Sequence, residues 1–524
     1  MDASVNRESI LRKIGTEQTE WDVLVIGGGA TGLGCAVDAA ARGYRTILFE
    51  ARDFANGTSS RSTKLVHGGV RYLRQGNLKL VLEALQERGR MLRNAPHLAH
   101  RRAFVIPAYS AFDAPFYGIG LTLYDLLAGR ESIGHPRILS ASSVHQELPT
   151  ARQTGLKGGI LYYDGQFDDA RYAVALFRTL LNLGGLAVNY ARIIALQKRD
   201  GKIVGVEAED DESGERFQVR AKVVINATGI FVDELRHMDS PEAPGVLTVS
   251  QGSHLVLPRS FLPGDSALMI PRTSDGRVLF AIPWHDRVVV GTTDVPVPQP
   301  DIEPQAKSDE RSFLLENIER FLGRKPEPAE VLSMWSGQRP LVRHKGSGST
   351  AAISRDHTIL ISDAGLVTVT GGKWTTYRRM AEDTIDKAAE LAGLKRAACR
   401  TQDLHLHGWT KTFDATVTWE KVYGTDLCSI RALSADNPEL AAPLHPNLPI
   451  KKTEIVWAAR YEMARTVEDV LARRTRALFL DARASIEAAT ETARLLAVEL
   501  GRDDAWQEAQ VRKFQRLARQ YVWT

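Results

Sequence analysis

Residues 21–50, WDVLVIGGGATGLGCAVDAAARGYRTILFE, constrain the fold more than any other stretch of the chain. A short apolar run has the composition of a buried strand, and a second apolar run ends in Glu50. Between them Gly27, Gly29 and Gly32 have GxGxxG spacing and lead into a helix-compatible stretch. Such glycines let the backbone turn tightly against a pyrophosphate, helix N–H groups face the phosphates, and the acid accepts from ribose hydroxyls. The segment therefore predicts a Rossmann-like strand–turn–helix–strand unit that binds a dinucleotide.

The features after this unit favour FAD over NAD, although an acid at Glu50 would serve either nucleotide. Residues 57–72, GTSSRSTKLVHGGVRY, form a polar, glycine-bearing segment where a simple nicotinamide domain would enter its next helix. Residues 223–229, VVINATG, read as a strand ending in a small-residue turn, suited to packing against an adenosine or ribityl chain. A second GxGxxG, which a reductase carrying both FAD and NAD(P)H usually needs, is not present. Electrons are therefore expected to enter from a bound substrate and leave to a different acceptor.

Length and composition limit the remaining choices. A chain of 524 residues is too long for one compact core, so two or three domains are expected. The 67 basic and 63 acidic residues give a net charge of only +4, which argues against nucleic-acid binding. Three cysteines lie far apart without CxxC spacing, so neither disulfides nor a metal site are predicted. No apolar stretch reaches the roughly 18–20 residues of a membrane span, and the N-terminus lacks signal-peptide features, so a cytoplasmic-side protein is expected.

The order of elements predicts an α/β fold whose nucleotide domain is discontinuous. Short alternating runs within residues 250–345 read as an antiparallel sheet that could cover an active site. Stretches 453–464, 483–500 and 504–522 have amphipathic spacing, which predicts an all-α C-terminal domain. The predicted boundaries are 22–100, 155–250 and 350–395 for the FAD-binding domain, 101–154 and 251–349 for the inserted substrate domain, and 402–524 for the C-terminal domain.

A series of motifs occurs in one order along nearly the whole chain. They include GGGATG at 27–32, GTSSRSTKLVHGGVRYL at 57–73, VVINATG at 223–229, QGSHLVLPR at 251–259, SGQRPLV at 336–342 and GGKWTTYR at 371–378. In these motifs the sequence resembles the FAD-dependent, membrane-associated glycerol-3-phosphate dehydrogenases of the respiratory type, and the resemblance is closer to their mitochondrial branch. The absence of a transit peptide and of a calcium-binding C-terminal extension favours a bacterial enzyme.

The resemblance implies a fold of the glutathione-reductase/amino-acid-oxidase type and a defined reaction. In that reaction sn-glycerol 3-phosphate is oxidised to dihydroxyacetone phosphate by hydride transfer to flavin N5, and electrons pass to a membrane quinone. A related oxidase that makes hydrogen peroxide is the alternative, because nothing in the sequence visibly controls oxygen access. A flavin-fold protein without turnover is disfavoured, because the proposed base and phosphate-binding residues are present. The expected location is the inner face of the bacterial cell membrane, bound peripherally to anionic lipid, and a homodimer is left open.

Alcohol oxidation needs a proton acceptor and a firm hold on the dianionic phosphate. His254 is the best candidate base, because a neutral imidazole can accept the hydroxyl proton whereas a guanidinium is a poor acceptor. The resemblance places Arg339 near the reacting hydroxyl, where it could polarise the substrate. Arginine binds phosphate through two parallel hydrogen bonds, and lysine supplies a mobile charge. The expected substrate-binding residues are Arg71, Tyr72, Arg355 and Lys373, which lie in motifs beside glycines and turn residues.

The residues expected to contact FAD follow from the same motifs. They lie in the glycine turn, in the segment after the second strand and in two later turns. They are Gly27, Gly29, Ala30, Thr31, Gly32, Glu50, Thr58, Ser59, Ser60, Lys64, Leu65, His67, Gly68, Thr228, Gly229, Gly372, Lys373 and Thr375.

A membrane-docking surface is predicted within residues 88–128. The first part, RGRMLRNAPHLAHRR, is rich in cations, and the second, AFVIPAYSAFDAPFYGIGLTLYDLL, is rich in aromatic residues and is broken by Pro107, Asp113 and Pro115. Basic residues beside exposed apolar ones suit a protein resting on anionic lipid. The alternative is that the apolar part forms the core of the inserted lobe.

Overall fold

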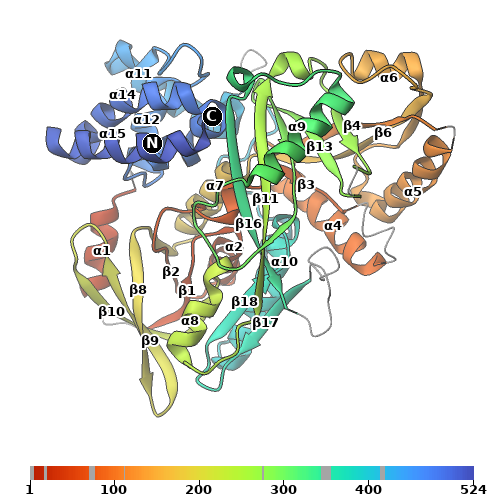
Figure 1. Cartoon of the computed structure of the whole chain (residues 1–524). Coiled ribbons are helices and arrows are strands. Elements are labelled where there is room, and N and C mark those ends of the chain that lie inside the picture. The colour runs from red at the N-terminus through yellow and green to blue at the C-terminus, as the bar shows by residue number, and fades with distance from the viewer. Residues whose placement is uncertain are drawn as a thin grey trace.

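The chain folds into two sheets and a helical C-terminal region, whose helices gather at the upper left of Figure 1. The computed structural model describes residues 5–16, 20–69, 77–110, 112–273, 276–343, 356–412 and 419–523.

The first sheet is parallel at its centre, as expected where strands alternate with covering helices. Its strand order is β17-β18-β10-β1-β2-β7, and the β8–β9 hairpin extends β10. Both faces of β1 are buried, since Val23 and Val25 join one hydrophobic cluster and Leu24 and Ile26 join another. The strands are β1 (Trp21–Ile26), β2 (Thr46–Phe49), β7 (Leu186–Val188), β8 (Ala191–Arg199), β9 (Lys202–Asp210), β10 (Arg216–Asn226), β17 (His357–Ile361) and β18 (Val367–Gly371).

Helices cover both faces of this sheet. The helix after the glycine turn, α2, contacts α7 and α10, while α1 packs near β7 and β10 on the opposite face. Helix α8 contacts β8 and β18. The bounds are α1 (Arg7–Thr16), α2 (Ala30–Ala41), α7 (Asp169–Asn182), α8 (Val232–Asp239) and α10 (Tyr377–Leu391).

The second sheet is antiparallel apart from the β4–β12 pair, and its order is β15-β11-β14-β13-β12-β4-β6-β3. Strand β16 pairs with β11, and β5 pairs with β6. Strand β6 lies in this sheet, although it falls within residues 155–250, which were assigned to the FAD-binding domain from the sequence. The predicted domain boundaries stay a prediction. The strands are β3 (Leu65–Val66), β4 (Ala99–Ala108), β5 (Arg137–Ser140), β6 (Gly158–Phe167), β11 (Leu247–Pro258), β12 (Ala267–Ile270), β13 (Leu279–Trp284), β14 (Arg287–Gly291), β15 (Val295–Val297) and β16 (Ser333–Val342).

Alternation along β11 gives the two faces of the second sheet different partners. Leu255 and Leu257 join a hydrophobic cluster with helix α9 (Ser308–Leu322), whereas Val256 joins the cluster that also contains Val23 of β1. The face that carries Val256 and His254 is therefore the one turned toward the first sheet. Helices α4 (Leu78–Asn94), α5 (Asp113–Ala128) and α6 (Ala141–Glu147) contact strands β4 and β6 of this sheet, at the right of Figure 1.

The C-terminal region is helical, which confirms the predicted class of this part of the chain. The predicted amphipathic stretches correspond to α12, α14 and α15. Among the described residues, no helix is both long enough and apolar enough to cross a bilayer. The bounds are α11 (Leu427–Asp436), α12 (Lys452–Tyr461), a π-helical turn (Asp469–Arg474), α13 (Ala477–Leu480), α14 (Ala482–Leu500) and α15 (Asp504–Ala518).

Candidate active site

Four groups of predicted FAD contacts meet at the carboxyl edge of the first sheet. Strands β1, β2, β10 and β18 run parallel, so the residues that follow them emerge at the same edge. Ligands of open α/β sheets bind outside this edge. The residues that emerge there are Gly27 to Gly32 after β1, Glu50 after β2, Thr228 and Gly229 after β10, and Gly372, Lys373 and Thr375 after β18.

The glycine turn is closely packed. Gly27 has φ of +112°, and a Cβ there would lie 2.6 Å from the Ala227 carbonyl oxygen. A Cβ on Gly32 would clash with the Gly27 carbonyl oxygen, so helix and turn approach closely only because both are glycines. Helix α2 begins after Gly29, which has no side chain to cap the first N–H groups, so its N-terminus suits a pyrophosphate.

Glu50 lies directly against this turn. Its Oε2 accepts from the Gly28 N–H at 2.5 Å, and its Oε1 accepts from the Arg52 N–H at 2.8 Å. Burial raises the pKa of the Glu50 carboxyl. The carboxylate keeps further lone pairs with which to accept from ribose hydroxyls. Turn, helix end and acid thus fit the adenosine half of a dinucleotide.

Residues 58–68 run from the glycine turn to the edge of the second sheet. The Ala30 N–H donates to Ser59 Oγ at 2.9 Å, which ties this segment to the start of α2. The His67 N–H donates to Thr375 Oγ1 at 3.2 Å, so the turn after β18 lies beside it. At the start of the segment, Thr58 Oγ1 donates to the Gln338 carbonyl oxygen. Toward its end, Leu65 enters β3 and the Gly68 N–H donates to the Tyr124 hydroxyl.

Lys64 is bound by the protein itself. Its ammonium donates to the Ser60 carbonyl oxygen at 2.7 Å and to both carboxylate oxygens of Asp169 at 2.8 and 2.7 Å. Burial and the charge of Arg476 lower the pKa of Lys64 to about 7. These three contacts use all three ammonium hydrogens, so Lys64 is placed to influence the FAD site by fixing residues 58–68 and not by a direct contact with the cofactor.

His254 and Arg339 lie on one face of the second sheet. They stand on the neighbouring strands β11 and β16, where His254 pairs with Trp335 and Ser250 pairs with Arg339. The Trp335 ring stacks on His254 with centroids 5.3 Å apart. Three glycines clear space on this face: a Cβ at Gly252 would clash with the Arg339 guanidinium, one at Gly291 with the His254 ring and one at Gly337 with Arg61. We call His254, Trp335 and Arg339, with Gly252 and Gly291, the catalytic face.

The surroundings of His254 keep its imidazole neutral. The ring is buried, and Nε2 lies 2.9 Å from Thr63 Oγ1, which belongs to the segment that contacts the glycine turn. Burial lowers the pKa of His254 well below its usual range, and the positive charges of Arg339 and Lys64 lower it further. A neutral imidazole near pH 7 can accept a proton.

Arg339 is held over Gly252 by the loop that follows β14. Its Nη2 donates to Thr292 Oγ1 at 3.0 Å and to the Thr293 carbonyl oxygen at 3.3 Å. Its Nη1 lies 3.7 Å from Asp294 Oδ1. The guanidinium therefore stands on the same face as His254 and near enough to influence its charge.

The other predicted substrate-binding residues are only partly placed. Arg71, Tyr72 and Arg355 lie outside the described residues. Lys373 follows Gly372, which has φ of +69°, and precedes the one-turn helix Trp374–Thr376. This position puts Lys373 at the carboxyl edge of the first sheet, two residues before Thr375.

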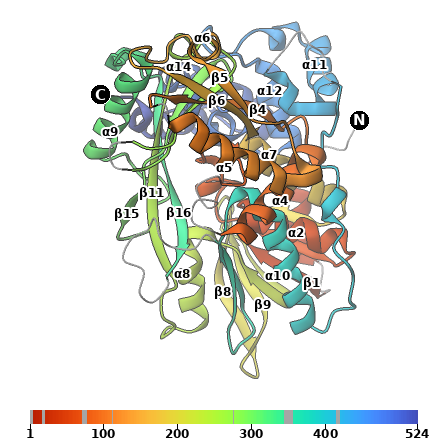
Figure 2. The ribbon, with the colours of Figure 1, turned by 90° about the vertical axis from the view of Figure 1, so that its right-hand side faces the viewer.

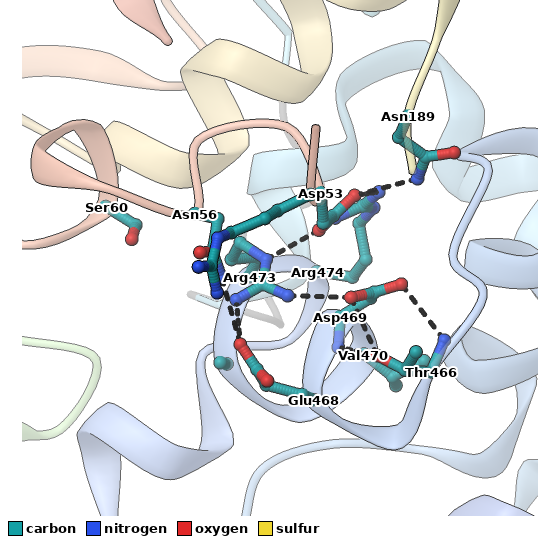
Figure 3. Close-up of polar contacts among 12 residues, drawn as sticks. Asp53, Asn56, Ser60, Asn189, Thr466, Glu468, Asp469, Val470, Arg473 and Arg474 are labelled. Atoms are coloured by element: carbon teal, nitrogen blue, oxygen red, sulfur yellow. Dashed lines mark hydrogen bonds and ion pairs between the residues drawn. The ribbon is translucent and has the colours of Figure 1, made fainter. Parts of the chain in front are cut away.

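The structure also shows a buried charge cluster that the sequence did not predict. It links the segment after β2 to the π-helical turn of the C-terminal region (Figure 3), and the start of α7 to Arg476 just after that turn. The one signal in the sequence is a run of arginines, RRTR, within the otherwise apolar stretch VLARRTRALFL. We define the charge cluster as Asp53, Lys64, Asp169, Arg473, Arg474 and Arg476, all buried.

The chain matches the models of two protein families. The one described as FAD dependent oxidoreductase matches residues 22–378, and the one described as the C-terminal domain of alpha-glycerophosphate oxidase matches residues 369–507. The first match covers more than half of the chain. It confirms the predicted fold class and FAD as the cofactor.

Curated relatives are similar over most of their length. The mitochondrial glycerol-3-phosphate dehydrogenase of Macaca fascicularis is 39% identical over 529 residues, covering 94% of this chain and 72% of that protein. The Homo sapiens protein of the same name is 38% identical over 535 residues, covering 95% of this chain and 73% of that protein.

Solved structures share the fold. A glycerol-3-phosphate dehydrogenase from Bacillus halodurans, crystallised with FAD, superposes with a TM-score of 0.80 at 28% identity, covering 98% of this chain and 97% of that one. An L-alpha-glycerophosphate oxidase from Mycoplasma pneumoniae superposes with a TM-score of 0.56 at 16% identity, covering 73% of this chain and 97% of that one. At that identity the second match speaks for the fold alone.

Proposed function

Because this chain belongs to the family of FAD-dependent glycerol-3-phosphate dehydrogenases, we propose that it oxidises sn-glycerol 3-phosphate to dihydroxyacetone phosphate and passes the electrons to a membrane quinone. The observation that carries the proposal is the catalytic face, where a neutral, buried His254 stands beside Arg339. Bound FAD supplies the hydride acceptor at N5. The protein's own residues then have to take the hydroxyl proton and hold the substrate in line.

His254 is the proposed proton acceptor. Its ring is fixed by the Trp335 stack and by the contact between Nε2 and Thr63 Oγ1, so little reorganisation is needed before it accepts the proton from the C2 hydroxyl. Arg339 stands over Gly252 and is proposed to hydrogen-bond the same hydroxyl oxygen, which lowers the cost of removing its proton. The two residues thus divide proton removal and polarisation between them.

The phosphate of the substrate is proposed to bind the cationic residues predicted from the sequence. Lys373 lies at the carboxyl edge of the first sheet, beside the turn that contacts His67. Arg71, Tyr72 and Arg355 are assigned the same role from their motifs. Holding a dianionic group at a distance from the reacting carbon orients that carbon, and orientation supplies much of the rate.

The surface of helix α5 supports the proposal that the electron acceptor lies in a membrane. Its outer side carries Phe112, Phe116, Ile119, Leu123 and Leu126, which are between 45% and 83% exposed. Their spacing follows one face of a helix, and this helix lies at the right-hand rim of Figure 1 and faces the viewer in Figure 2. An exposed apolar stripe of this size is rare on a protein that has no partner for it.

The two sequence interpretations of this segment concern opposite sides of α5. Leu121 and Tyr124 of α5 are buried in the lobe, while the opposite side of the helix is the exposed stripe. Ile138 of β5 is 69% exposed beside it, and the exposed cations Arg130 and Arg137 flank it. Apolar side chains with neighbouring cations suit the surface of an anionic bilayer. We propose that α5 rests on the inner face of the bacterial cell membrane, where a quinone is available.

The competing function is an oxidase that passes the electrons to oxygen, which the family description of residues 369–507 keeps open. Purified protein reduced anaerobically with glycerol 3-phosphate separates the two. Rapid reoxidation by a quinone in anionic vesicles, with slow reoxidation in air, is the proposed result. Fast reoxidation in air with one hydrogen peroxide formed per substrate would replace the dehydrogenase assignment with the oxidase.

The docking of α5 has a matched control. Phe116→Ser with Ile119→Ser should weaken sedimentation with anionic vesicles and slow turnover with vesicle-bound quinone, while a water-soluble electron acceptor still works at the original rate. Val498→Ser alters an exposed apolar residue on α14, 72% exposed, and should change neither. Equal vesicle binding by all three proteins would exclude α5 as the docking surface.

A further inference from the structure

The segment from Asp53 to Lys64 is held on two sides. Toward the FAD site, Ser59 Oγ accepts from the Ala30 N–H at the start of α2, and Thr63 contacts His254. Residues 58–60 form a single helical turn, so they move together. On the other side the same segment meets residues 468–476 of the C-terminal region (Figure 3).

Asp53 is the first of three attachment points on that second side. Its Oδ2 accepts from Arg473 Nε at 2.5 Å and from Arg474 Nη1 at 2.6 Å, and its Oδ1 accepts from Arg474 Nη2 at 2.8 Å. The carboxylate is fully buried. Although burial alone would raise it, the charges of Arg474 and Arg473 lower the pKa of Asp53 to about 2. Asp53 is therefore charged and fully bound at any physiological pH.

The second and third attachment points follow at intervals along the segment. Asn56 Nδ2 donates to Glu468 Oε1 at 3.0 Å, and the same oxygen accepts from Arg473 Nη1 at 2.7 Å. The Ser60 carbonyl oxygen accepts from Arg476 Nη2 at 2.9 Å. Asp53, Asn56 and Ser60 thus bind C-terminal side chains, while Ser59 and Thr63 between and after them face the FAD site.

From this alternation we infer that residues 468–476 are a positioning element for FAD: they fix the Asp53–Lys64 segment, and through it the contacts at the glycine turn, without touching the cofactor. Charged bonds at three points leave the segment little freedom to shift. Releasing the first point should let Ser59 move away from the start of α2, so the FAD site would lose its pre-formed geometry. The inference rests on the FAD cofactor and not on the substrate proposed above.

A second buried pair allows this role to be separated from simple stabilisation. Arg171 of α7 donates to both oxygens of Glu462, each at 2.7 Å, so this pair also joins the C-terminal region to the rest of the protein. It is as deeply buried as the Asp53 contacts. In the described part of the chain neither side chain hydrogen-bonds residues 53–64, although Arg171 Nη1 also donates to the Arg474 carbonyl oxygen at 3.5 Å.

The test compares Asp53→Asn with Glu462→Gln, two isosteric changes from carboxylate to amide. FAD release from purified holoenzyme is followed through the fluorescence of the freed cofactor, and the visible circular dichroism of bound FAD is recorded beforehand. Asp53→Asn should release FAD about 10- to 100-fold faster than wild type and alter the dichroism. Glu462→Gln should lower the melting temperature but release FAD at close to the wild-type rate with an unchanged dichroism.

Asn56→Ala provides a milder version if Asp53→Asn does not fold. It removes only the hydrogen bond to Glu468, and it should speed FAD release by a smaller factor with the same direction of change in dichroism. FAD release and dichroism that match wild type in Asn56→Ala and Asp53→Asn, or that change equally in Glu462→Gln, would overturn the inference. None of these readouts requires turnover, so the proposed reaction could fail while this result stands.

Discussion

The catalytic face and the charge cluster border the same short segment but use polar groups in opposite ways. On the catalytic face, glycines on β11 and β14 clear space around His254 and Arg339. In the charge cluster, Asp53 and Asp169 each accept several bonds from buried cations. A cluster of paired charges can stabilise one arrangement, whereas a neutral base beside a cation can take part in a reaction. Changes in the cluster should therefore cost stability and, at Asp53, the retention of FAD, and changes on the face should cost rate.

The largest effect is expected from Asp169→Asn in the charge cluster. Asp169 accepts from Lys64 and from Arg476 and is fully buried, so the amide would remove the carboxylate that both side chains bind and leave Arg476 paired with Asp168 alone. Breaking a buried pair from one side costs about 3–5 kcal/mol. Urea unfolding followed by tryptophan fluorescence measures the loss. A cost below about 1 kcal/mol would show that the cluster is solvated like a surface pair.

A smaller effect of the opposite kind is expected from Gly291→Ala on the catalytic face. The new methyl group would clash with the His254 ring and push it from its place beside Trp335. A displacement of about 1 Å can cost on the order of 10²-fold in rate, while an extra buried methyl costs about 1–3 kcal/mol in stability. Stopped-flow flavin reduction and thermal melting report the two separately. A variant that loses stability but keeps its reduction rate would contradict the distinction between the two regions.

The smallest effect per residue concerns mild acid. His97 and His254 are buried and His100 is half-buried, and loss of hydration lowers the pKa of His97 and of His100 to about 3 and that of His254 well below its usual range. Below about pH 6.5 the unfolded chain takes up protons that these folded imidazoles refuse, so stability falls by about 1 kcal/mol per histidine over the first pH unit. Asp53, with its pKa near 2, keeps its charge in this window.

Melting temperatures measured from about pH 7.5 down to 5.5 test this order. We expect a decline that begins near the ordinary histidine pKa and becomes shallower in His97→Gln and His100→Gln. A melting temperature that stays constant over this range would mean that the buried histidines are protonated in the folded protein. Asp53 should contribute to acid unfolding only at much lower pH, where its carboxylate gains a proton.

How much the sequence could predict depends on how local each signal is. The turn, helix and strand of residues 21–50 follow from glycine spacing and apolar runs within thirty residues, and β2 lies directly before Glu50, where the second apolar run was predicted. His254 and Arg339 could be proposed because short motifs mark them. The bonds from Arg474 to Asp53 span 421 residues, and a run of arginines is usually solvated, so nothing local pointed to their burial.

Prolines show a second limit on what could be predicted from the sequence. Pro107 was expected to break the chain, but it lies near the end of β4, paired with Gly159. Pro115 falls in the first turn of α5, where the missing N–H has no partner to lose. A proline near the end of a strand or in the first turn of a helix is therefore compatible with that element, and its position could be judged only once the ends of the elements were known.

The central claim is that the catalytic face performs the chemistry, and flavin reduction in His254→Asn tests it most directly. Wild type and variant are mixed anaerobically with glycerol 3-phosphate, and the loss of visible flavin absorbance is followed in time. We expect the variant to retain FAD and substrate binding but to reduce its flavin about 10²- to 10⁴-fold more slowly, because asparagine cannot accept the proton. Reduction within a few-fold of wild type would contradict the claim and transfer the role to Arg339 or to an ordered water.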